Sequence, residues 1–115
     1  MSLTLTDNTL LEKYGLVMGE AHLATEKQLP LYQDMWKMKD IKTIPGGSCL
    51  NTIRAANFML KGQFPGKCAF FSCIGKDEFG DRLETLLKEQ GILSNFHKDE
   101  SVPTGTCAVL IKDLQ

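Results

Sequence analysis

The sequence predicts an α/β protein, and three observations support this fold class. From about residue 40 onward, apolar runs of strand length alternate with amphipathic runs of helix length. The run at 68–74 is almost continuously apolar, which is typical of a parallel strand covered on both faces. Glycine-containing turns separate the runs, as in right-handed β-α-β crossovers. We therefore expect a piece of a doubly wound sheet.

The N-terminal segment is expected to hold two helices joined by an extended stretch. Asp7 is placed to cap a short helix over 8–14, and Gly15 is placed to end it. Residues 16–23 are expected to be extended and suited to a small lid sheet. Thr25 is placed to cap a second helix that runs to about residue 39, although its internal proline distorts or delays its first turn.

The middle of the chain is expected to run from strand to helix to strand. A strand over 41–45 leads into a glycine pair, and a helix over 50–60 follows. A loop is expected over 62–67, before the apolar strand at 68–74.

The C-terminal part is expected to hold one helix and two strands. Asp77 is a natural N-cap for a helix that Gly91 ends. One carboxylate is too few for a Ca²⁺ site, so Asp77 is interpreted as a cap and not as a metal ligand. Strands are expected over 92–96 and 107–112, with a turn at 103–105 between them.

Composition limits the partners that we expect. The 115 residues carry 13 basic and 14 acidic side chains, a net charge of −1, which predicts neither nucleic acid nor an anionic membrane as a partner. No apolar run approaches the roughly 20 residues of a membrane span. The four cysteines form no C-x-x-C pair, so we expect reduced, buried thiols in a cytoplasmic protein.

The glycine pair before the helix over 50–60 is the most informative feature. Gly46 and Gly47 let a ligand come close to the backbone, because no Cβ stands in the way. The following helix start offers unpaired N–H groups and a positive dipole end. Asn51 lies one turn in, and its amide both donates and accepts. The pattern predicts a site for a hydroxyl-rich small molecule or an anion, with a plain strand-to-helix turn as the alternative.

This motif and three others downstream carry a resemblance to a known family. They are Pro-Gly-Gly-Ser-x-x-Asn at 45–51, Cys-Ile-Gly-Lys-Asp-Glu-Phe-Gly at 73–80, Gln-Gly-Ile at 90–92 and Pro-Thr-Gly-Thr-Cys-Ala at 103–108. In this order the chain resembles the N-terminal part of adenosine kinases, a branch of the ribokinase-like sugar and nucleoside kinases. The resemblance implies a three-layer α/β/α sheet carrying a small β lid. It places core segments at about 40–92 and lid segments at about 3–25 and 95–115.

The resemblance also implies a substrate, a reaction and site residues. The reaction is ATP-dependent phosphorylation of the 5′-hydroxyl of adenosine to AMP in purine salvage, with ATP and Mg²⁺ as cofactors. An aspartate takes the hydroxyl proton, and the oxygen then attacks the γ-phosphate. The residues implied to bind adenosine are Gly46, Gly47, Ser48 and Asn51 for the ribose, and Leu23 and Cys107 for the purine.

Two features of the family find no match in these residues. Its sugar-binding aspartate falls before Leu3, and its Gly-Ala-Gly-Asp motif, with the catalytic aspartate and the ATP site, matches no segment. We therefore expect the 115 residues to supply the sugar cradle and part of the lid, to have no kinase activity alone, and to self-associate through open sheet edges. The alternatives are another ribokinase-like sugar kinase, or a non-catalytic nucleoside-binding or interaction module.

Overall fold

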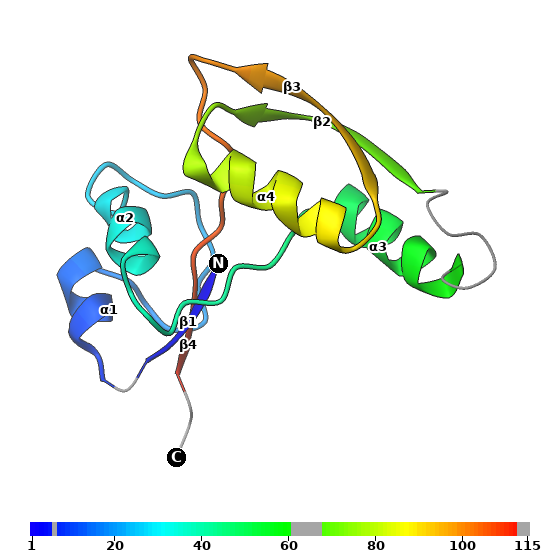
Figure 1. The fold of residues 1–115 in the computed structure, drawn as a ribbon. Helices are drawn as coiled ribbons and strands as arrows, with labels where there is room; N and C mark the ends of the chain where they lie inside the picture. The colour runs from blue at the N-terminus through cyan, green and yellow to red at the C-terminus, as the bar shows by residue number, and fades with distance from the viewer. Residues whose placement is uncertain (6, 61–67, 113–115) are drawn as a thin grey trace. The chain divides into compact units, whose positions relative to one another are not determined.

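The computed structural model describes residues 1–5, 7–60 and 68–112, and they form two compact units (Figure 1). The first unit comprises Met1–Thr43 with Cys107–Gln115, and the second comprises Ile44–Thr106. The elements in chain order are β1 (Ser2–Leu5), α1 (Thr9–Tyr14), α2 (Pro30–Trp36), α3 (Ser48–Leu60), β2 (Ala69–Gly75), α4 (Glu78–Glu89), β3 (Leu93–Asp99) and β4 (Val109–Lys112).

The first unit is built around a two-stranded parallel sheet and two short helices. β1 pairs with β4 from Ser2↔Val109 to Leu5↔Lys112, so the two ends of the described chain meet in one sheet. The side chains that β1, α1 and α2 bury form one apolar cluster: Leu3, Leu5, Leu11, Tyr14, Leu31 and Met35. The unit is therefore held together by contacts between residues far apart in the sequence.

Both predicted helices of the first unit form, and the second is shorter than expected. The Asp7 carboxylate accepts the N–H of Thr9 at 2.8 Å, and Gly15 ends α1 with a left-handed φ of 61°. α2 begins at Pro30, which needs no N–H partner there. The residues before Pro30 form a turn, in which the Thr25 carbonyl accepts the N–H of Gln28 at 2.8 Å.

Two predicted strands do not form. Residues 16–23 contain no strand, because Gly15 and Gly19 both have positive φ, 61° and 81°, and turn the chain away from an extended path. In 41–45 the structure describes one isolated β-bridge, antiparallel between Lys42 and Ser2, and a proline without an N–H ends the segment. The loop expected over 62–67 lies outside the described residues.

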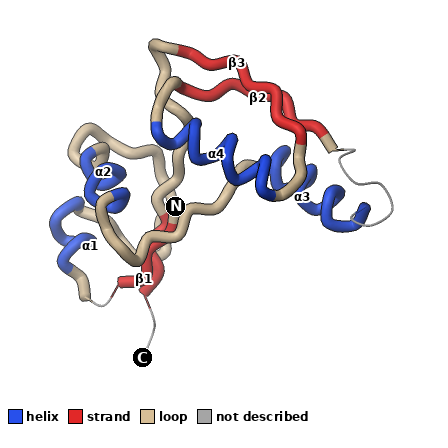
Figure 2. Tube along the Cα trace, in the orientation of Figure 1, coloured by secondary structure: helices blue, strands red, loops and turns tan. Residues whose placement is uncertain are grey.

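The second unit confirms the α/β class. β2 and β3 pair in parallel from Ala69↔Leu93 to Gly75↔Asp99, and α4 connects them. α3 and α4 cover one face of this sheet (Figure 2). The buried cluster beneath them is Leu50, Phe70, Leu87 and Ile92, and the rings of Phe70 and Phe96 meet edge to face with centroids 5.9 Å apart.

No described helix or strand covers the opposite face of β2 and β3, which corrects one expectation. Residues 68–74 were expected to be covered on both faces, but Phe71 on this face is 71% exposed and Leu93 is 63% exposed. The expectation of buried thiols also fails in part, since only Cys68 of the four free cysteines is buried. No helix among the described residues is long and apolar enough to span a membrane.

Candidate functional site

The glycine turn has the backbone that the sequence predicts. Gly47 has a φ of 100°, a conformation that side chains other than glycine rarely adopt. Its carbonyl accepts the N–H of Asn51 at 2.9 Å, so it stands in the N-cap position of α3. A Cβ added at Gly46 or Gly47 would meet no atom of the described residues within 4 Å. The turn therefore borders open space.

The start of α3 presents polar groups beside this turn. N–H groups in the first turn of a helix have no partner within the helix, and the dipole makes this end positive. Gly47 has no side chain that could cap them, and Ser48 and Asn51 are exposed. α3 has 13 residues, so its dipole is developed over several turns. The arrangement suits an acceptor such as a hydroxyl or an anion.

Arg54 fixes the groups around the turn, and sequence reasoning missed it. Its Nη1 donates to the Pro45 carbonyl at 3.2 Å and to Asn51 Oδ1 at 3.4 Å. Its Nε donates to Gln90 Oε1 at 2.9 Å. The available signal was the i, i+3 spacing of Asn51 and Arg54, which puts both side chains on one face of a helix.

The motif at 73–80 forms a hydrogen-bonded cluster with Thr104 at the start of α4. Thr104 Oγ1 accepts the N–H of Gly75 at 2.9 Å, and the Thr104 N–H donates to Asp77 Oδ2 at 2.7 Å. Asp77 Oδ1 accepts the N–H of Gly80 at 2.8 Å, which confirms the predicted N-cap. A Cβ at Gly75 would lie 2.7 Å from Asp77 Oδ2, the Thr104 nitrogen and the Val102 carbonyl oxygen. The glycines are thus needed for packing.

The same hydrogen-bonded cluster lowers the pKa of Asp77. Burial disfavours the carboxylate, but hydrogen bonds from the backbone of Thr104 and Gly80 outweigh this penalty and hold the pKa of Asp77 below its usual range. Asp77 is therefore ionised near neutrality and acts as a structural anion.

The six residues predicted to bind substrate are divided between the two units. Gly46, Gly47, Ser48 and Asn51 lie together in the second unit, at the start of α3. Leu23 and Cys107 belong to the first unit. Leu23 is 94% exposed, and Cys107 is also exposed. Their contact with a purine stays a prediction.

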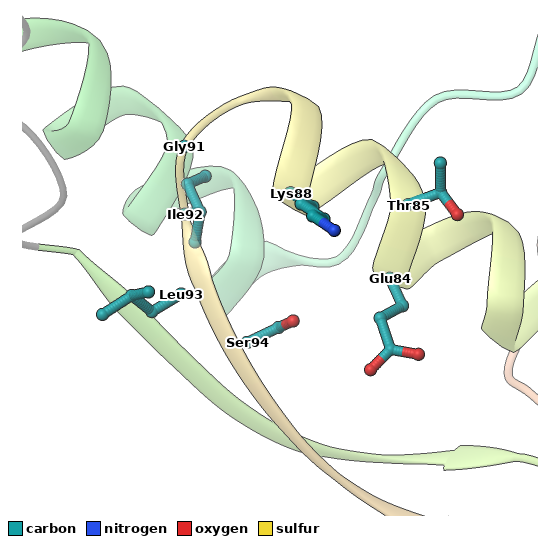
Figure 3. A pocket seen from close by; sticks show the side chains of 7 residues that line it. All are labelled: Glu84, Thr85, Lys88, Gly91, Ile92, Leu93 and Ser94. Carbon is teal, nitrogen blue, oxygen red and sulfur yellow. The ribbon is translucent and has the colours of Figure 1, made fainter.

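A hollow of about 550 Å³ lies elsewhere on the second unit (Figure 3). Its lining comes from α4, the following turn and the start of β3: Glu84, Thr85, Lys88, Gly91, Ile92, Leu93 and Ser94. The Glu84 carboxylate is paired with Lys98 Nζ at 2.8 Å. The hollow shares no residue with the glycine turn. Across the described ranges, no three His, Cys, Asp or Glu side chains gather as metal ligands.

A parallel α/β unit with a glycine at the cap position of an open helix start is typical of α/β proteins that bind small molecules at helix N-termini. Comparison narrows the class: the chain belongs to the pfkB family of carbohydrate kinases, whose sequence model matches residues 8–114. It is 35% identical over 105 residues to adenosine kinase 1 of Arabidopsis thaliana. The matched region covers 91% of this chain and 30% of that protein. The chain thus spans about a third of the length of the curated relatives that it matches.

Solved adenosine kinases share this fold. The apo structure from Trypanosoma brucei brucei is 34% identical with a TM-score of 0.86, covering 96% of this chain and 33% of that chain. An adenosine kinase from Schistosoma mansoni, solved in complex with adenosine in an occluded loop conformation, is 28% identical with a TM-score of 0.74, covering 96% of this chain and 32% of that one. The ribokinase-like fold class predicted from the sequence is confirmed.

Proposed function

We propose that this chain forms the ribose-binding part of an adenosine kinase, which transfers the γ-phosphoryl group of ATP to the 5′-hydroxyl of adenosine. The observation that carries the proposal is the glycine turn at the start of α3, which borders open space and leads to Asn51. The motif that forms it is the one implied to hold ribose, in a chain 35% identical to an adenosine kinase over 91% of its length.

In this proposal the vicinal hydroxyls of ribose meet the backbone and one amide. N–H groups at the start of α3 donate to a hydroxyl oxygen, with the positive end of the helix dipole behind them. Gly46 and Gly47 keep Cβ atoms away, so the sugar reaches the backbone. Asn51 adds a side-chain amide one turn into α3. Such a site rejects analogues without the hydroxyls, because its own polar groups would be left unpaired.

The purine is proposed to contact Leu23 and Cys107 of the first unit. Both side chains are exposed in the chain as described, which leaves them free to form the apolar walls that a flat base needs. This contact, the assignment of the two units to a lid and a core, and a cytoplasmic location are predictions from the sequence.

We assign ATP and Mg²⁺ to no residue of this chain. Both are proposed as cofactors of the phosphoryl transfer because the chain belongs to a family of carbohydrate kinases and is similar to adenosine kinases. The role that we propose for the residues of this chain is to bind and orient the sugar.

Titration of the 115-residue chain with adenosine, followed by amide chemical shifts, tests the ribose contact. Asn51→Ala is expected to weaken binding by about tenfold, as loss of a hydrogen bond to a hydroxyl predicts. Asn95→Ala is the matched control, because Asn95 is also exposed but lies on β3. Shift changes that spare 46–51, or equal binding by both variants, would contradict the proposal.

Two further measurements separate adenosine kinase from its alternatives. Ribose that competes with adenosine at similar strength would favour a different sugar kinase of the pfkB family. We also propose that the 115 residues alone transfer no phosphoryl group. A steady, adenosine-dependent release of ADP above a blank without protein would contradict this.

A further inference from the structure

Arg54 contacts the residues on both sides of the glycine turn but is not among the residues proposed to bind ribose. It lies in the second turn of α3, half-buried, and its guanidinium reaches three separate parts of the second unit. Nη1 contacts the Pro45 carbonyl at 3.2 Å, just before the glycine turn, and Asn51 Oδ1 at 3.4 Å, just after it. Nε contacts Gln90 Oε1 at the end of α4 at 2.9 Å. One planar group thus spans the turn on both sides.

The chemistry of these groups fixes the orientation of the Asn51 amide. A guanidinium has five N–H donors and no acceptor, so the atom of Asn51 that faces it must be the carbonyl oxygen. The nitrogen of the Asn51 side-chain amide then points away from Arg54. Asn51 is thereby left with two N–H donors and one committed oxygen.

We propose that Arg54 is a positioning residue that makes Asn51 a hydrogen-bond donor to its ligand and holds the glycine turn in its bent form. It does so without touching the ligand, and it is anchored to α4 through Gln90. The part of the proposal that concerns a sugar rests on the proposed function, with a ribose hydroxyl oxygen as the acceptor. The orientation of Asn51 does not depend on it.

The geometry requires arginine and not merely a positive charge. The fork lets Nε hold Gln90 while Nη1 holds the two acceptors at the turn. Lysine has a single nitrogen on a flexible stem, so it cannot span both places at once. Arg54→Lys therefore keeps the charge and the apolar stem but loses the bridge.

Asn57 supplies a matched control for general loosening of α3. Its Nδ2 donates to the Gln90 carbonyl at 2.9 Å, so it also ties α3 to the end of α4. Asn57 makes this tie from the same helix, about one turn beyond Arg54. Asn57→Ala removes a comparable tie while leaving the three Arg54 contacts in place.

The test measures the motion of the Asn51 side-chain amide by ¹⁵N relaxation in the ligand-free 115-residue chain. We expect its order parameter to fall in Arg54→Lys and Arg54→Ala relative to the wild-type chain. It should stay at the wild-type value in Asn57→Ala. An unchanged value in both Arg54 variants, or an equal fall in Asn57→Ala, would overturn the proposal.

Adenosine titration of the same variants then tests the link to the ligand. Arg54→Lys is expected to weaken adenosine binding about three- to tenfold, the effect of one poorly placed hydrogen bond, and Asn57→Ala less than twofold. A mobile Asn51 amide with undiminished adenosine affinity would refute its role as the donor. If the wild-type chain binds no adenosine, the proposed function fails, and the relaxation data still decide the role of Arg54.

Discussion

Replacing Asp77 by asparagine is expected to destabilise the second unit by about 1.5–3 kcal/mol. The carboxylate uses both oxygens, Oδ1 for the N–H of Gly80 at 2.8 Å and Oδ2 for the N–H of Thr104 at 2.7 Å. Asparagine keeps one oxygen and turns an NH₂ group towards the other N–H. One donor is then left unpaired, and the remaining bond loses its charge assistance.

Asp77→Ala extends the same argument. It removes both hydrogen bonds at once, so the loss of the N-cap adds about 1 kcal/mol to the effect of asparagine. Asp81→Asn is the control, because Asp81 is an exposed acid in the same first turn, 3.6 Å from Lys98 Nζ. An exposed pair of this kind contributes at most about 1 kcal/mol.

The assay must report on the second unit by itself. Trp36 is the only tryptophan and belongs to the first unit, so tryptophan fluorescence is the wrong probe. Native-state amide hydrogen exchange of β2 and β3 gives the opening free energy of this sheet. The hydrogen bonds around Asp77 lie at the end of β2. If Asp77→Asn stays within about 0.5 kcal/mol of the wild type, or matches Asp81→Asn, the reasoning fails.

Four further outcomes follow from the same structure. Gly75→Ala should destabilise the second unit by about 2–3 kcal/mol in the exchange assay, because its Cβ meets three atoms at 2.7 Å, whereas Gly46→Ala should change it by less than about 0.5 kcal/mol. Leu87→Ala should cost about 2–5 kcal/mol, since this side chain is 0% exposed. The pKa of Asp77 is lowered by folding, so its contribution is present above the unfolded pKa and is lost as pH falls through the folded one; the stability gap between wild type and Asp77→Asn should therefore close below about pH 4. Light scattering at about tens of micromolar should detect self-association through the exposed sheet face around Phe71, and a clean monomer would contradict this.

α4 could be predicted from the sequence because every local signal agrees. Asp77 caps it, Gly91 follows it with a φ of 70°, and Leu83 and Leu87 recur on its inner side. All three signals act within the helix or at most two residues beyond its ends. Local chemistry was therefore sufficient.

The two predicted strands that do not form show that local sequence signals cannot predict strand pairing. Residues 41–45 have strand-like composition, but the β-bridge described there joins Lys42 to Ser2, which is far away in the sequence. β1 and β4 pair across more than a hundred residues, which no period in either segment specifies. The i, i+3 spacing of Asn51 and Arg54 shows only that they share a helix face; the contact of Arg54 with Gln90 joins two helices and has no local signal. Whether a segment pairs is decided by tertiary partners.

The starts of α3 and α4 differ in how their N–H groups are satisfied, and this difference supports the proposed binding site. At α4 the chain supplies its own anion: the Asp77 carboxylate takes the N–H of Gly80, and no space remains for a Cβ at Gly75. At α3 the cap position is Gly47, which has no side chain, and the space beside Gly46 and Gly47 is open. Both helices present the same unpaired N–H groups and the same dipole. One start is satisfied from within the fold, and the other is open to solvent, which is why we propose that a ligand binds there.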